Sequence, residues 1–193
     1  MPSNPVKAGG AAALLAAGLL VLSAVLYAIS PVDGVLDTWS EYAYQVVVLV
    51  AYLAATVAIF GVHVIHRGRR GYGWIGTAGA VVTAAGYAVV TVVAAISIFR
   101  DVEYLLTVRI AGAGLVLAGS ALLGVAVLTA RLMPWWCGVL LIVAFPLGDV
   151  ANVLFPTAEN LLLALLWGSL GFALLALTRQ PSRPVVTHTA NVR

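Results

Sequence analysis

The sequence predicts an all-α integral membrane protein: a six-transmembrane-helix bundle with the N-terminus and the C-terminus both cytoplasmic. Three observations predict this fold class: the composition, the spacing of the apolar stretches and the distribution of the basic residues. Of the 193 residues, 63% are hydrophobic and 9% are charged, and the mean hydropathy is +1.08. Because a soluble domain is about half apolar and about a quarter charged, this chain needs lipid around its apolar surface.

Six apolar stretches are separated by short polar or turn-forming segments. About 20 apolar residues are enough for a helix to cross a bilayer. Each stretch is close to that length or longer, and we expect helices at residues 9–28, 44–65, 74–99, 104–130, 135–156 and 160–177. Because the connections are short, the helices form a single domain over residues 1–178, followed by a flexible cytoplasmic tail at 179–193.

The first three stretches are delimited by an acidic segment and a basic segment. The stretch 9–28 is longer than the roughly 7–15 apolar residues of a signal peptide, which favours a retained helix over a cleaved leader. The turn-rich segment 30–41 carries Asp33, Asp37 and Glu41 and precedes the second stretch. The arginine-containing sequence HRGRRGYG separates the second stretch from the third.

Prolines delimit the last three stretches. A short charged connector, 100–103, precedes the fourth stretch, which ends at Arg131 and is followed by the break at Met133 and Pro134. Proline is favoured in the first turn of a helix, so Pro134 also marks the start of the fifth stretch. Pro156 ends the fifth stretch, and the sixth begins near Asn160.

The basic residues divide unequally between the two ends of the predicted bundle. Alternating loops place eight of them at the end that holds the termini: Lys7, Arg67, Arg69, Arg70, Arg131, Arg179, Arg183 and Arg193. Arg100 and Arg109 lie at the other end, together with most of the carboxylates. The positive-inside rule therefore places both termini in the cytoplasm. We expect a multi-pass protein of the plasma membrane, and the Ala-, Val- and Leu-rich composition is typical of bacterial examples.

Composition and motifs argue against several function classes. The basic residues are scattered over short loops and the tail, without the dense patch that nucleic-acid binding requires. Cys137 is the single cysteine, which excludes an internal disulfide and CxxC motifs. The chain also lacks a GxSxG elbow, an HExxH motif and a P-loop. We therefore predict no nucleic-acid partner and no cofactor.

Small residues at four-residue spacing predict where the helices pack closely. In a membrane, small side chains let two helix backbones approach each other. Such rows begin at Gly9, Gly114, Ser120 and Ser169. We interpret them as packing faces within the bundle rather than as specific dimerisation motifs.

The fifth stretch carries the main candidate site. Asp149 and Asn152 follow Pro146 inside an apolar span, and ionisable residues in spans usually face a bundle interior. Pro146 removes a backbone donor and is expected to kink the helix. Arg109 and Asp149 lie roughly 7 Å and 9 Å from the same end of neighbouring helices, at 1.5 Å per residue. We expect either an Arg109–Asp149 ion pair or an outward-facing polar cavity that Gln45 also lines.

Two other interpretations of polar residues stay open. Arg109 is long enough to extend to the outer headgroups instead of pairing. His63 and His66 share one helical face and are weak candidates for metal ligands. The neighbouring arginines disfavour a cation there. Interfacial histidines, or a basic patch touching anionic lipid headgroups, are the alternative.

The polar residues crowd one end of the predicted bundle, which bears on function. Transporters and enzymes usually place several polar groups at mid-membrane, so we expect a non-enzymatic protein that is structural or accessory to a membrane complex. The alternative is a small-solute or proton-coupled transporter or channel with a cavity at Arg109 and Asp149. A further alternative is a membrane enzyme acting on a lipid or isoprenoid. The expected partners are the bilayer and either another membrane protein or a second copy.

Overall fold

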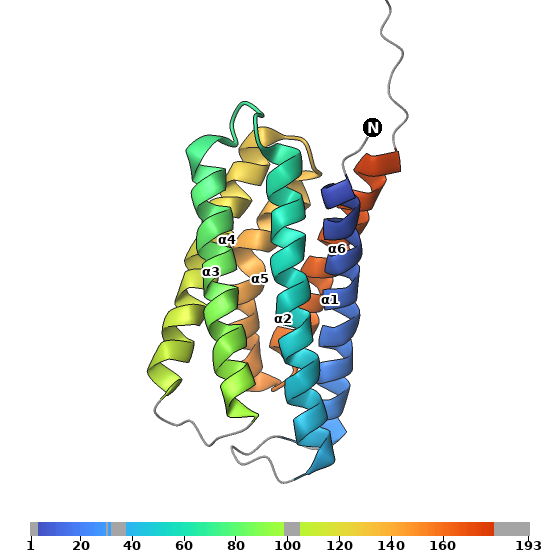
Figure 1. Ribbon diagram of the computed structural model, residues 1–193, viewed down its shortest axis with the longest axis vertical. Helices are drawn as coiled ribbons and strands as arrows, with labels where there is room; N and C mark the ends of the chain where they lie inside the picture. Colours follow the sequence, from blue (N-terminus) through green and yellow to red (C-terminus); the bar gives the residue numbers. More distant parts are fainter. Residues whose placement is uncertain (1–3, 30, 32–37, 99–104, 180–193) are drawn as a thin grey trace, which may run out of the picture.

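Six helices make up the computed structural model, which describes residues 4–29, 31, 38–98 and 105–179 (Figure 1). All six are long and apolar enough to cross a membrane, and the described residues contain no strand. The predicted all-α, six-span fold is confirmed. The helices are α1 (Asn4–Ile29), α2 (Trp39–His66), α3 (Gly73–Ser97), α4 (Leu106–Ala130), α5 (Trp135–Leu154) and α6 (Ala158–Arg179).

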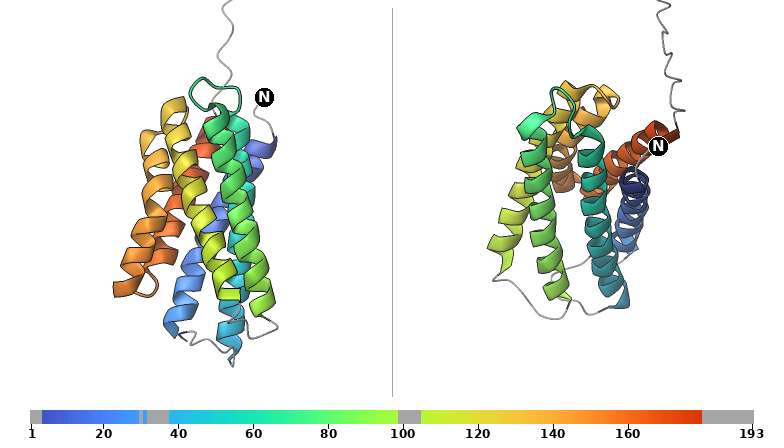
Figure 2. Two further views of the ribbon diagram at one scale, coloured as in Figure 1. Left: turned by 90° about the vertical axis from the view of Figure 1, so that its left-hand side faces the viewer. Right: turned by 45° about the horizontal axis from the view of Figure 1, so that its top comes forward.

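The helices form a closed ring in chain order. Each helix packs against the next, and α1 packs against α6 to close the ring. The views in Figures 1 and 2 show the helices running along the long axis, with the start of α1 and the end of α6 at the same end. This end, which also holds the α2–α3 and α4–α5 turns, is called the termini end. The opposite end is called the far end. The side of the membrane that each end faces stays a prediction, and the predicted tail lies outside the described residues.

The start of α2 differs from the sequence prediction by five residues. Helix α2 begins at Trp39 rather than Tyr44 because Thr38 and Glu41 form a capping box. The Glu41 amide donates to Thr38 Oγ1 at 3.4 Å, and the Thr38 amide donates to Glu41 Oε2 at 3.0 Å. Glu41 is therefore a buried residue of the first helical turn, where the positive end of the helix dipole also favours its charge.

The start of α6 also lies earlier than expected, with a consequence for the site. Helix α6 begins at Ala158, two residues before Asn160. Glu159 is therefore in the first turn of a helix and is half-buried, whereas the sequence suggested a loop position. An acid at a helix N-terminus is stabilised by the helix dipole, which explains why the helix tolerates a carboxylate there.

Close backbone contact joins α1 to α2. A Cβ atom added to Gly9 would lie 2.6 Å from the Cα of Gly61, a distance that real Cβ atoms essentially never show. The row that begins at Gly9 is thus a packing face, and Ala13 in the same row is completely buried. The row that begins at Gly114 is not, because a Cβ there would meet nothing within 4 Å. A face that is apolar but unpacked within the bundle is available to lipid.

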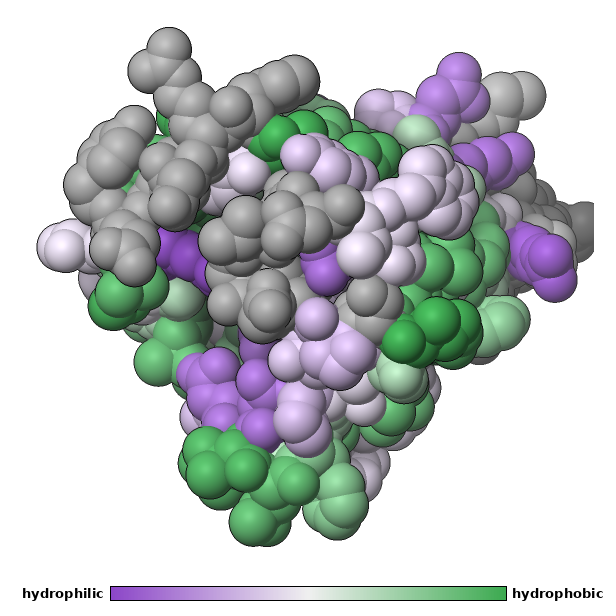
Figure 3. Space-filling view, turned by 90° about the horizontal axis from the view of Figure 1, so that it is seen from below, coloured by the Kyte–Doolittle hydropathy of each residue, from purple (hydrophilic) through white to green (hydrophobic). Residues whose placement is uncertain are grey.

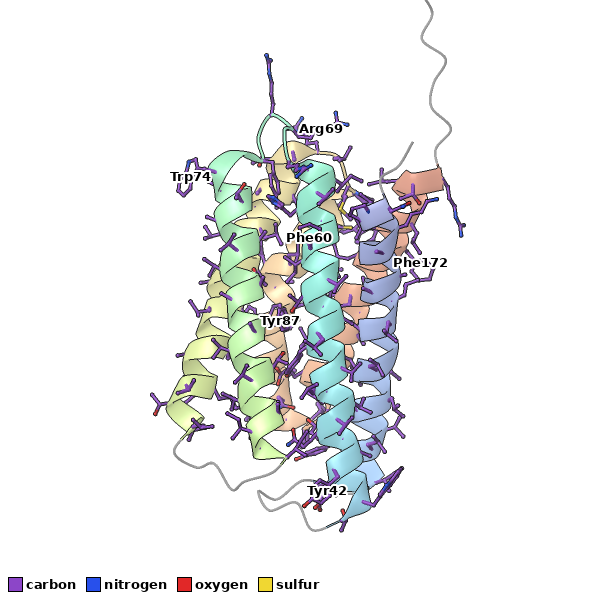
Figure 4. The ribbon with its side chains drawn as sticks, viewed as in Figure 1. Tyr42, Phe60, Arg69, Trp74, Tyr87 and Phe172 are labelled. Carbon is purple, nitrogen blue, oxygen red and sulfur yellow. The ribbon has the colours of Figure 1, made fainter. Side chains whose placement is uncertain are left out.

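Aromatic side chains fill the middle of the ring. Tyr87 on α3 lies 5.5 Å from Tyr52, 6.3 Å from Phe145 and 6.0 Å from Trp167, measured between ring centroids. These contacts join α2, α3, α5 and α6, and the stick view shows Tyr87 between α3 and α2 (Figure 4). Phe60 and Phe172, by contrast, are 57% and 69% exposed and point away from the bundle. The aromatic layer separates the two ends of the interior.

Candidate ligand cavity

A cavity lies between α2, α3 and α4 in the far half of the bundle. Its empty volume is about 420 Å³, including its open mouth. The far end is seen face-on in Figure 3, where hydrophilic side chains gather between hydrophobic ones. Nine of the described residues line the cavity: Tyr44, Gln45, Val48, Tyr52, Val90, Val93, Ala94, Ser97 and Arg109.

The lining has a polar part and an apolar part. Gln45, Ser97 and Arg109 supply an amide, a hydroxyl and a guanidinium group, whereas the wall between them is made of valine and alanine. Ser97 Oγ donates to the Val93 carbonyl at 2.9 Å, so its oxygen is left as an acceptor. Tyr52 stands at the inner end of this lining and contacts Tyr87 of the aromatic layer. The lining thus combines polar groups from three helices with a wall of valine and alanine.

Arg109 is the cationic residue of the lining. Its side chain is exposed, and within the described part of the chain no carboxylate lies close enough for an ion pair, at 4.0 Å or less. Its positive charge nevertheless interacts electrostatically with Tyr44, Tyr52 and Glu159. Its planar guanidinium therefore keeps several N–H donors for a ligand at the cavity.

Glu159, in the first turn of α6, is a charged residue near Arg109 that the sequence analysis did not assign to a candidate site. It packs on Gly148 of α5, where an added Cβ would lie 3.2 Å from both its Cα and its Cγ. Asp149 and Arg109 both interact electrostatically with its carboxyl group. The next residue, Asn160, has its side chain beside the Tyr44 hydroxyl. Among the described residues of the far end, Arg109, Asp149 and Glu159 therefore form an electrostatically coupled group.

The structure brings together some of the predicted site residues and separates others. Gln45 and Arg109 line one cavity. Asp149 and Asn152 are not part of its lining, and Asp149 is exposed on α5. Asn152 is half-buried, and its Oδ1 atom is buried without a hydrogen-bond partner. Helix α5 continues through Pro146 without a break in its helical assignment, and a kink there stays a prediction.

His63 and His66 are held by one tyrosine at the termini end. His63 Nδ1 and the Tyr72 hydroxyl lie 3.1 Å apart, and the Tyr72 ring stacks on His66 with centroids 5.4 Å apart. His66 Nδ1 donates to the Val62 carbonyl at 2.8 Å, which fixes its proton on that nitrogen. The described residues contain no group of three His, Cys, Asp or Glu side chains placed to hold a metal ion.

Tyr44, Tyr52 and Ser97 are further cavity residues that sequence reasoning did not assign to a site. Tyr44, Val48 and Tyr52 recur every four residues, so a stripe on one face of α2 was visible in the sequence. A stripe of this kind on an apolar helix does not by itself indicate a ligand site, because such residues also pack in a helix bundle.

No family model, curated protein or solved structure matches this chain. The six apolar helices show a multi-pass membrane protein. Any more specific function has to be argued from the geometry of the far-end cavity.

Proposed function

We propose that this protein is a transporter-type, solute-binding protein of the plasma membrane, and that it takes a small organic anion in the far-end cavity. The ligand is a monocarboxylate with a short apolar tail. The observation that carries the proposal is Arg109, a cation at a partly apolar cavity with no ion-pair partner among the described residues. A guanidinium group binds a carboxylate through two parallel hydrogen bonds, which are stronger than neutral ones.

The rest of the lining supports an amphipathic ligand. Val48, Val90 and Val93 offer an apolar surface beside Arg109, and burying a methylene group there contributes about 0.8 kcal/mol. Gln45 and Ser97 add groups that fix the orientation of a polar head.

The neighbouring acids favour a monoanion over a dianion. The carboxyl group of Glu159 interacts electrostatically with both Asp149 and Arg109. Like charges at short range repel in a medium of low dielectric. A second carboxylate on the ligand would face this repulsion, whereas a single one is neutralised by Arg109.

The cavity supports binding more than a purely structural role. Its lining brings Gln45, Ser97 and Arg109 from three helices to one space. A protein that is only structural or accessory to a complex has no need of such a space, and that function is the alternative outcome of the test.

The test measures ligand-dependent thermal stability of the purified protein in lipid nanodiscs. The probes are straight-chain monocarboxylates from acetate to octanoate, with primary alcohols of the same length as neutral controls. We expect the carboxylates to raise the unfolding temperature, with an optimum at intermediate length. Arg109→Gln weakens the response about a hundredfold in affinity and Arg109→Lys about tenfold, since lysine keeps the charge but loses the second hydrogen bond.

Arg179→Gln is the matched control, because it removes the same exposed charge at the termini end. A response that persists in Arg109→Gln, or equal responses to carboxylates and alcohols, would contradict the proposal and favour the structural role.

A further inference from the structure

The α2–α3 turn at the termini end presents three arginines on an ordered backbone. Arg67, Arg69 and Arg70 are all exposed. The Arg69 amide donates to the His66 carbonyl at 3.0 Å, and the Tyr72 amide donates to the Arg69 carbonyl at 3.3 Å. The turn therefore has a defined path, and its arginines project from fixed positions.

Tyr72 anchors this turn in the bundle. Its side chain is only 1% exposed, contacts His63 through its hydroxyl and stacks on His66. Its ring also lies so close to Gly76 that a Cβ atom there would overlap the ring. A basic turn that serves only as a topology signal needs no such anchor.

A second contact joins the turn to the end of α4. Thr129 Oγ1 donates to the Gly71 carbonyl at 2.6 Å, and Gly71 (φ +91°) lies against the Thr129 carbonyl. Arg70 precedes Gly71 and Arg131 follows Thr129 by two residues, so the contact brings the two turns that carry these arginines close together. We call the surface formed by Arg67, Arg69, Arg70 and Arg131 the basic platform.

Arg131 occupies a backbone position that favours glycine. It ends α4 in the left-handed conformation, with φ 52° and ψ 28°. Glycine adopts this conformation without steric cost and is the usual residue at such a helix end. An arginine there keeps an exposed charge at the expense of an unfavourable backbone.

Exposed tryptophans place the basic platform at the level of the lipid headgroups. Trp74 lies in the first turn of α3 and Trp135 in the first turn of α5, and their side chains are 77% and 71% exposed. Arg69 and Trp74 are seen at the same end of the molecule in Figure 4. Tryptophan is enriched where the hydrocarbon meets the headgroups, so the arginines are expected at the level of the lipid phosphates.

We propose that the basic platform is a specific binding site for the phosphate headgroup of one anionic phospholipid. Guanidinium groups from two turns, held together by the Thr129–Gly71 contact, clamp the phosphate. The site is distinct from the far-end cavity and does not depend on the function proposed for it.

The test counts lipids that stay bound to the purified full-length protein by native mass spectrometry, after titration with dioleoyl phosphatidylglycerol or dioleoyl phosphatidylcholine. We expect one phosphatidylglycerol to be retained, and its affinity to fall at least tenfold in the double variant Arg70→Gln/Arg131→Gln. The matched control is Lys7→Gln/Arg179→Gln, which removes two exposed charges at the same end, on α1 and α6.

The variant Arg131→Gly distinguishes a loss of lipid binding from a loss of protein stability. Glycine suits the left-handed position, so this variant unfolds at a higher temperature than the original protein without lipid, yet gains less from phosphatidylglycerol. The proposal is overturned if the control double variant loses as much lipid as the platform variant, which indicates diffuse attraction. Equal binding of phosphatidylcholine, or full stabilisation by inorganic phosphate alone, also overturns it.

Discussion

At the scale of single residues, Tyr72 shows how one side chain orders a whole turn. It is buried beneath the α2–α3 turn, and burial raises the pKa of its hydroxyl above the ordinary value. The hydroxyl therefore keeps its proton near neutral pH and forms a neutral contact with His63 Nδ1. The ring, through its stacking on His66, contributes more to stability than the hydroxyl does.

Tyr72→Phe is expected to lower the free energy of unfolding by about 1 kcal/mol, the net contribution of a typical hydrogen bond. Tyr72→Ala is expected to lower it by about 3–5 kcal/mol, since it leaves a large cavity. Thermal unfolding in one detergent measures both. Equal losses in the two variants would show that the ring packing contributes nothing beyond the hydroxyl.

At the scale of helices, the contact between α1 and α2 depends on two glycines that face each other. A methyl group on either backbone would overlap the other helix. Gly18 lies on the same helix as Gly9, but nothing lies within 4 Å of the position where its Cβ would be. The two kinds of glycine make a controlled comparison within one bundle.

Gly61→Ala is expected to destabilise the protein by about 1–3 kcal/mol because it forces the two helices apart. Gly18→Ala is expected to stabilise it by roughly 0.5–1 kcal/mol because alanine is the better helix former. Denaturation in mild detergent measures the two variants side by side. A tolerated Gly61→Ala would mean that the α1–α2 contact is looser than the structure shows.

The helices also show what could be predicted from the sequence. Length and apolar content give the spans, and depth along a span follows from counting residues, which is how Arg109 and Asp149 were expected at similar depth. Rotation about the helix axis is not readable when a helix is apolar nearly all round. For that reason the exposure of Asp149 and the unpacked face at Gly114 were not foreseen. The capping box of Thr38 and Glu41 could be recognised in the sequence. The start of the second helix was instead predicted from the beginning of the apolar stretch, at residue 44.

At the scale of the whole molecule, the two ends have different chemistry. The termini end carries the anchored arginine turn, and the far end carries the cavity with Arg109 and the nearby carboxylates. The aromatic layer around Tyr87 stands between them. The positive-inside rule predicts that the cavity opens away from the cytoplasm. The cavity, its charge and its orientation make up one claim that a single experiment addresses.

That experiment is thiol modification of Ser97→Cys on intact cells, in a Cys137→Ala background that removes the buried native cysteine. The modification rate of Ser97→Cys is measured with an anionic and with a cationic methanethiosulfonate reagent. Each rate is divided by the rate at which the same reagent modifies a small thiol in solution. We predict that the anionic reagent is favoured about tenfold, since a cation in a cleft concentrates anions, and that Arg109→Gln removes the preference. Arg69→Cys, at the opposite end, is predicted to react only after the membrane is permeabilised. Equal normalised rates at Ser97→Cys, or labelling of Arg69→Cys in its place on intact cells, would contradict the account.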